Sequence, residues 1–200
     1  MSAAPKGRRF PFSSYICIVQ TMNKLVAQNH PALHSIAEEI TPEEFADGSV
    51  AKILAGMRKA IKTYDVDGYA AVAIAAPQVG VAKRMFLVED QNQDRDEALP
   101  TVIAINPRIV KYSKKVHEVG EGCLSVPNKY GVVERHKNVV LEALDEHGQP
   151  FSRGAGGLLA QIFQHECDHL DGTLFIDRAV ETWHKDDRPA GITEAEDEQN

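Results

Sequence analysis

Two histidines one helical turn apart limit what this chain can fold into. His165 and His169 are four residues apart, a spacing that places both imidazoles on one face of a helix. Leu158 and Ile162 continue the same stripe toward the N-terminus, so this face is expected to point into the protein interior. A single cation held away from bulk water can then accept both rings. The pattern therefore predicts a metal-binding helix.

Glu166 lies directly after the first of these histidines. On a helix its side chain points beside a cation held by the two rings and not at it, which suits a base that takes a proton from a water on the metal. The alternative is that His165 and His169 are a polar helix face or hydrogen-bonded core side chains. A His-Glu-x-x-His motif is uncommon by chance in a chain with eight histidines, which favours the metal site.

Two histidines leave a catalytic metal one protein ligand short. Phe175 stands where some peptidases with this motif have a third histidine, and it cannot bind a metal. Gly172 is interpreted as the residue that ends the helix in a left-handed conformation. A downstream glutamate ligand would have to come from Glu181 or the acidic tail, a region without helical patterning. Cys167 falls on a different face of the helix and is expected to be a core residue. Cys123, which is flanked by glycine and a β-prone apolar pair, remains as the candidate for the third ligand.

We expect one further helix and several strands. The helix follows Ser49, which can cap its start, and runs toward Gly68, which can end it. The histidine-bearing helix is expected to begin near Gly156 or Gly157. Alternating or β-rich runs predict strands at residues 84–89, 101–106, 108–112 and 138–144. The last of these strands is expected to form a hairpin with residues 149–153.

Composition and charge narrow the class of protein. The 200 residues, 43% of them apolar, suffice for one globular domain, and no repeat or linker suggests a second. The longest uncharged apolar stretch, residues 69–77, is too short to span a membrane, so a soluble protein is expected. A net charge of −7 argues against general binding to nucleic-acid phosphates. Three cysteines are too few for a disulfide framework.

The two ends of the chain differ in charge. Residues 1–37 contain basic residues and no acid, so the start is either an organelle transit peptide or a plain N-terminal extension lying over the domain. Residues 181–200 are rich in acids and include Pro189, which predicts a solvated, partly disordered tail.

Three motifs together resemble the peptide deformylase family. In chain order they are Ala75-Ala76-Pro77-Gln78, Glu121-Gly122-Cys123-Leu124-Ser125 and Gln164-His165-Glu166-Cys167-Asp168-His169. The resemblance runs from residue 29 to residue 177. It implies an α+β fold in which antiparallel β-sheets wrap around a central helix that bears the HExxH motif. The implied organisation is an N-terminal extension at residues 1–28, a catalytic domain at residues 29–180 and an acidic tail at residues 181–200.

The resemblance also implies an activity and a cofactor. Family members are metal-dependent hydrolases that remove the N-formyl group from the initiator methionine of newly made polypeptides and release formate. Cys123, His165 and His169 would hold the metal, which in this family is usually Fe²⁺, with Zn²⁺, Ni²⁺ or Co²⁺ as substitutes. One sulfur and two nitrogens suit any of these ions.

Roles for further residues follow from the same resemblance. Glu166 would act as the base, while the side-chain amide of Gln78 and the backbone N–H of Leu124 would stabilise the oxyanion. Glu121 and Arg135 would form an ion pair that supports the Cys123 segment. The alternative for Arg135 is a charge on the surface of a strand.

The expected substrate site departs from the family at two positions. Leu158 and Ile162 would line the pocket for the methionine side chain, or be plain core residues. Ala71 and Ala73, the second of which would lie beside the substrate, stand where the family has glycine. If those glycines had positive φ, alanine would force the segment to shift. If they had ordinary strand angles, the added methyl groups would only make the pocket narrower.

These departures leave three hypotheses. The first is an active deformylase; the others are a related amidase or peptidase with another acyl substrate, and a non-catalytic homologue that binds a metal or a peptide. The expected partners are formyl-methionyl nascent polypeptides, with the ribosome exit region as a further candidate, and neither nucleic acid nor a membrane is expected. The expected location is the cytoplasm, or an organelle if the basic start is a transit peptide.

Overall fold

The computed structural model describes residues 24–66, 69–90 and 99–187. Its helical elements are η1 (Pro31–His34), α2 (Pro42–Ala46), α3 (Ser49–Thr63), η2 (Ala76–Val79), α4 (Gly157–Leu170), α5 (Phe175–Arg178) and η3 (Lys185–Asp187). Its strands are β1 (Asp65–Val66), β2 (Tyr69–Ala70), β3 (Ala73–Ala75), β4 (Met85–Val88), β5 (Val102–Tyr112), β6 (Val116–Cys123), β7 (Val126–His136), β8 (Asn138–Leu144), β9 (Pro150–Gly156) and β10 (Glu181–His184).

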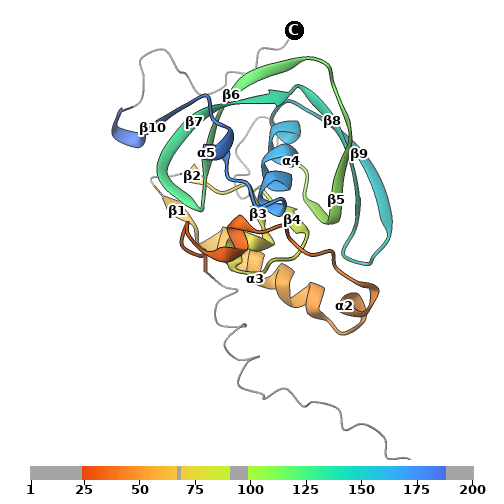
Figure 1. Ribbon diagram of the computed structural model, residues 1–200. Coiled ribbons are helices and arrows are strands. Elements are labelled where there is room, and N and C mark those ends of the chain that lie inside the picture. Colours follow the sequence, from red (N-terminus) through yellow and green to blue (C-terminus); the bar gives the residue numbers. More distant parts are fainter. Residues whose placement is uncertain (1–23, 67–68, 91–98, 188–200) are drawn as a thin grey trace, which may run out of the picture.

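Within the described residues, the strands form three sheets in which all neighbouring strands are antiparallel. A five-stranded sheet has the order β3-β4-β5-β8-β9, a three-stranded sheet has the order β10-β7-β6, and β1 pairs with β2. Figure 1 shows α4 in the middle of the molecule with the long strands curving around it, and α3 beside β3 and β4. The expected α+β arrangement around the histidine-bearing helix is therefore confirmed.

Helix α3 forms where its apolar residues recur at helical spacing, and this apolar face packs against η2, β3 and β4. Its ends differ slightly from the prediction. Gly48, with φ of 80°, occupies the cap position, and Ser49 is the first helical residue. The helix ends at Thr63, well before Gly68, because Tyr64 already has an extended backbone.

Helix α4 begins at Gly157, as predicted. Gly172, two residues beyond its end, has φ of 73°, and a Cβ built there would lie 2.9 Å from the backbone nitrogen of Ser35. Only glycine fits this turn, which brings the chain back against the segment before α2. Cys167 is buried in the core beside Phe163, as expected, and burial raises the pKa of its thiol to about 12.

The predicted strands are present, although two of them are parts of a single longer strand. Residues 101–106 and 108–112 form the single strand β5, in which Asn106 has positive φ and the register to β8 shifts. The predicted hairpin is confirmed as β8 and β9. The prediction missed the long hairpin of β6 and β7, because glycines and charged residues interrupt the alternation of apolar residues there.

The predicted end segments lie largely outside the described residues. Near the N-terminus, the backbone N–H of Val26 donates to the carbonyl of Gln78, so the chain already contacts η2 before residue 29. Near the C-terminus, β10 pairs with β7, although its residues were expected to belong to the acidic tail. Within the described ranges, no helix is both long and apolar enough to cross a membrane.

Candidate metal centre

Three predicted ligands come together between β6 and α4. The ligand atoms of Cys123, His165 and His169 all lie within 4.8 Å of one another, and Cys123 Sγ is 3.1 Å from His169 Nε2. Cys123 is the last residue of β6, whereas the two histidines project from successive turns of α4. A sulfur and two ring nitrogens at this separation fit a single divalent ion of the borderline-soft kind.

The charges around the thiol favour the form that binds a metal. Burial by itself would raise the pKa of Cys123, but the electrostatic interaction with His169 and the hydrogen bond to His165 outweigh it and lower this pKa to about 5. The thiolate is the form of cysteine that ligates metals. This electrostatic setting supports the fit of the three residues to a cation.

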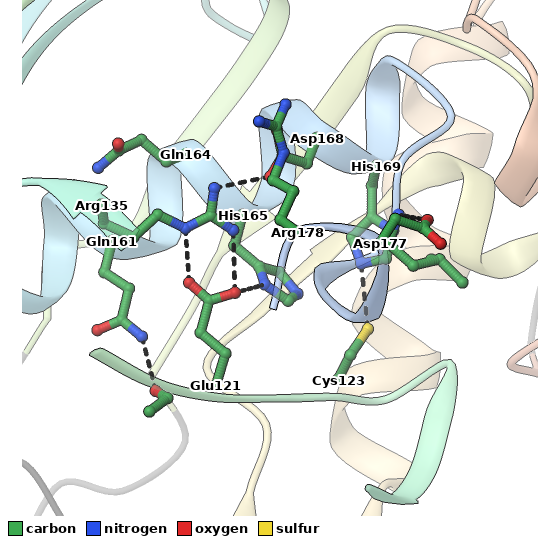
Figure 2. Close-up of polar contacts among 12 residues, drawn as sticks. Glu121, Cys123, Arg135, Gln161, Gln164, His165, Asp168, His169, Asp177 and Arg178 are labelled. Atoms are coloured by element: carbon green, nitrogen blue, oxygen red, sulfur yellow. Dashed lines mark hydrogen bonds and ion pairs between the residues drawn. The ribbon is translucent and has the colours of Figure 1, made fainter. Parts of the chain in front are cut away.

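Glu121 orients the first histidine, and Arg135 holds Glu121 in turn (Figure 2). His165 Nδ1 lies 2.9 Å from Glu121 Oε2, which leaves Nε2 for a metal. The guanidinium of Arg135 donates to both oxygens of Glu121, at 2.7 and 2.9 Å. Arg135 is only 4% exposed, so the alternative of a surface charge is wrong.

The Glu121 carboxyl is strongly acidic in this setting. Burial opposes its ionisation, but the hydrogen bonds from His165 and Arg135 outweigh burial and lower the pKa of Glu121 to about 2. The carboxylate therefore stays charged at neutral pH and keeps accepting from the histidine ring. Such a partner fixes the ring orientation of a metal ligand.

Glu166 stands beside the ligands and has a free carboxylate oxygen. Both the residue and its Oε2 atom are buried, and Oε2 has no hydrogen-bond partner among the described residues. Burial raises the pKa of Glu166 to about 7, against the opposing effect of His165 and His169. A carboxyl group with this pKa can both take up and give back a proton near neutral pH.

Gln78 reaches the same site from η2. Its Oε1 accepts from the backbone N–H of Ala75 at 2.8 Å, and its Nε2 lies 3.2 Å from Ser125 Oγ and 3.5 Å from Cys123 Sγ. The residue is buried, so the amide is held in one orientation beside the thiol. Leu124 follows Cys123 in the tight turn between β6 and β7.

A cavity of about 270 Å³ opens onto these groups. It is lined by the predicted catalytic residues, the predicted pocket residues and both alanines: Gln78, Leu124, Glu166, Leu158, Ile162, Ala71 and Ala73. Ile162 is buried, while Leu158 is 42% exposed at the rim. Cys123, His165 and Glu121 line the cavity as well, whereas His169 and Arg135 do not line it but contact Cys123 and Glu121.

The two alanines have ordinary backbone angles. Among the described residues other than glycine, only Asn106 and Asn128 have positive φ, so neither Ala71 nor Ala73 is in a conformation that requires glycine. Their methyl groups are nearly buried in the cavity wall. Alanine therefore narrows the cavity without straining the chain.

Four residues of the network received no role from the sequence, although Gln164 and Asp168 belong to the third motif. Gln161 Nε2 donates to the carbonyl of Gly120 at 2.9 Å, and Gln164 bonds both the N–H and the carbonyl of His136, so both tie α4 to the β6–β7 hairpin. Asp168 pairs with Arg135 and also with Arg178 of α5. The signal for three of them was the polar stripe at residues 161, 164 and 168 of α4, whereas nothing in the local pattern marked Arg178.

The polypeptide deformylase family model matches residues 22–185. The chain belongs to the peptide deformylase family. A peptide deformylase from Synechocystis is 38% identical to it over 148 residues, which cover 73% of this chain and 74% of the relative. The chloroplastic peptide deformylase 1A of Solanum lycopersicum is 34% identical over 171 residues, or 80% of this chain. The match spans 60% of the length of that plant deformylase.

Solved deformylases share the fold. The class I type b peptide deformylase from Acinetobacter baumannii, solved with Met-Ala-Ser bound, superposes with a TM-score of 0.68 at 31% identity, covering 78% of this chain and 97% of that one. The predictions of the deformylase family, of a metallo-hydrolase and of a Cys-His-His metal site are confirmed.

Proposed function

We propose that this deformylase removes the N-formyl group from the N-terminal methionine of newly made polypeptides and releases formate. The observation that carries the proposal is the free, buried Oε2 of Glu166 beside the Cys123, His165 and His169 ligand atoms, at the wall of a cavity large enough for a side chain. A binding protein has no need of a carboxylate with a pKa of about 7 at that place.

The metal is proposed to be Fe²⁺, with Zn²⁺, Ni²⁺ or Co²⁺ able to replace it, because the sulfur and nitrogen donors suit each of these ions. When bound, the metal supplies Lewis acidity, which lowers the pKa of a water and polarises the formyl carbonyl. Cys123, His165 and His169 would hold it.

Glu166 would move the proton. Its carboxylate accepts a proton from the attacking water, and the carboxylic acid then donates that proton to the amine of methionine as the formyl C–N bond breaks. Gln78 Nε2 and the backbone N–H of Leu124 would donate to the oxyanion that forms on the formyl carbon. The hydrogen bond from Ala75 to Gln78 Oε1 keeps that amide in place before the substrate arrives.

The peptide is proposed to bind as an extended strand. β3 is the last strand of the five-stranded sheet and β6 is the last strand of the three-stranded sheet, so each has one edge that pairs with no other strand among the described residues. Ala73 on one edge and Gly122 on the other both line the cavity. A peptide can add to such edges through main-chain hydrogen bonds. Leu158 and Ile162 would then receive the methionine side chain.

Residues 29–180 are proposed to carry this activity, with nascent polypeptides as the partner and the ribosome exit region as a candidate neighbour. The cytoplasm is the proposed location. An organelle is the alternative, and the relative from Solanum lycopersicum is a chloroplastic deformylase.

Formate release from formyl-Met-Ala-Ser tests the proposal directly. Protein loaded anaerobically with Fe²⁺ is expected to release formate from this peptide and no acetate from acetyl-Met-Ala-Ser. Glu166→Gln, which keeps the shape of the side chain, is expected to retain the metal and to lose about 10²-fold or more in kcat. No formate from the wild-type protein with metal bound, or equal turnover of the acetyl peptide, would refute the proposal.

A further inference from the structure

A chain of alternating charges leads from α5 to the metal ligands (Figure 2). Arg178 Nη2 lies 2.8 Å from Asp168 Oδ1, and Asp168 Oδ2 accepts from Arg135 Nη1 at 2.7 Å. Arg135 donates to both oxygens of Glu121 from its other two nitrogens, Nε and Nη2, and Glu121 contacts His165. Every step of this chain is a direct contact of less than 3 Å.

Among the carboxylates and guanidiniums of this cluster, the charges balance only if Arg178 is counted. The side chains of Arg135 and Glu121 are 4% and 2% exposed and that of Asp168 is 10% exposed, so all three are nearly out of water. Without Arg178, two buried carboxylates would share the single guanidinium of Arg135. A buried charge that lacks its partner is costly, so the remaining groups would rearrange to reduce that cost.

That rearrangement would reach the metal site. If Asp168 lost its second partner, it would draw Arg135 toward itself and away from the two-point contact with Glu121. Glu121 would then hold His165 less firmly, and the ring nitrogen on the metal side would lose its fixed direction. The same short helix also places Phe175 against His165, with ring centroids 6.5 Å apart. α5 therefore contacts this histidine directly through Phe175 and indirectly through the ion pairs that begin at Arg178.

We propose that Arg178 is a positioning residue of the metal centre, which neutralises Asp168 so that Arg135 is free to fix Glu121 and thereby His165. This inference rests on the proposed metal centre, but it concerns geometry several contacts away from the metal. Because Arg178 is 50% exposed, it can be replaced without opening a cavity in the core.

Three variants separate the charge from the side-chain volume. Arg178→Met removes the charge and keeps the stem, Arg178→Gln keeps a hydrogen-bond donor, and Arg178→Lys keeps the charge. Lysine can replace arginine here because Asp168 receives a single contact from Arg178. The matched control is Arg108→Met, which breaks the exposed ion pair with Glu39 on another face of the protein.

The readouts are the visible spectrum of the Co²⁺-loaded protein, the rate at which a chelator removes the metal, and kcat and KM for formyl-Met-Ala-Ser. Arg178→Met and Arg178→Gln are expected to alter the Co²⁺ ligand-field bands, to release the metal about 10-fold faster and to lower kcat about 10-fold with little change in KM. Arg178→Lys is expected to restore most of each value. Arg108→Met is expected to match the wild type.

An unchanged Co²⁺ spectrum and metal release rate in either uncharged variant would overturn the inference and leave Arg178 as an anchor of α5 only. Equal damage in Arg178→Lys would also overturn it, because the effect would then not depend on charge. If the wild-type protein releases no formate, the proposed function fails, but the spectrum and the release rate still decide the role of Arg178.

Discussion

At the scale of single residues, Gln78 is held on both sides of its amide. Ala75 donates to Oε1 and Ser125 Oγ lies beside Nε2, so the side chain has one orientation. If Nε2 also stabilises the oxyanion, Gln78→Ala should lower kcat about 100-fold, equivalent to about 3 kcal/mol of barrier, with the metal retained. Steady-state kinetics and metal analysis check this.

Ser125→Ala is the control for Gln78. It removes the neighbour of Nε2 but leaves the amide in the site, so kcat is expected to fall by much less than in Gln78→Ala. Equal losses in the two variants would mean that Gln78 acts only through its contact with Ser125.

Ala71 and Ala73 give a second prediction at this scale. Because their φ angles are ordinary, changing each to glycine relieves no strain and is expected to lower the free energy of unfolding by about 0.5–1 kcal/mol. The value of kcat/KM for formyl-Met-Ala-Ser is expected to stay within about threefold of wild type. Urea unfolding and kinetics check both; a rise of tenfold in kcat/KM would show that the methyl groups obstruct the substrate.

At the scale of elements, the carboxylate of Glu121 in β6 contacts both Arg135 in β7 and His165 in α4. The folded-state pKa of Glu121 is about 2, below its ordinary value of 4.5. A depressed carboxyl pKa contributes stability that is present above pH 4.5 and is lost as the pH falls toward 2. The free energy of unfolding is therefore expected to decline steeply over that window.

Denaturant unfolding at a series of pH values checks this expectation. Glu121→Gln, which cannot ionise, is expected to be less stable at neutral pH and to lose less stability across the same window. The surface variant Glu142→Gln is expected to follow the wild-type curve. Parallel curves for wild type and Glu121→Gln would contradict the role of this carboxylate.

At the scale of the whole molecule, the metal site joins one sheet to the central helix. Cys123 ends a strand of one sheet, while His165 and His169 belong to the helix that both large sheets surround. A ligand that binds only the folded state stabilises it, so removal of the metal by a chelator is expected to lower the Tm by about 5 °C.

Differential scanning calorimetry with and without chelator checks this prediction. Adding back a divalent metal should restore the Tm, and His169→Ala should melt at the same temperature with or without chelator. A wild-type protein whose Tm ignores both chelator and metal would show that the three ligand residues do not hold an ion.

Several features of this protein follow from the sequence by itself. The four-residue spacing of His165 and His169 places both rings on one face of any helix, because 3.6 residues complete each turn regardless of what surrounds it. The start of α4 and the β8–β9 hairpin follow from equally local patterns. Together with the motifs around Gln78 and Cys123, such patterns were enough to identify the family.

The remaining features were decided by the tertiary structure. The burial of Arg135, the pairing of Arg178 with Asp168 and the placing of Cys123 against α4 join residues from different elements. The β6–β7 hairpin was not predicted because its glycines and charged residues obscure the two-residue period of apolar residues. Contacts between elements depend on strand register and packing, which no short stretch of sequence specifies.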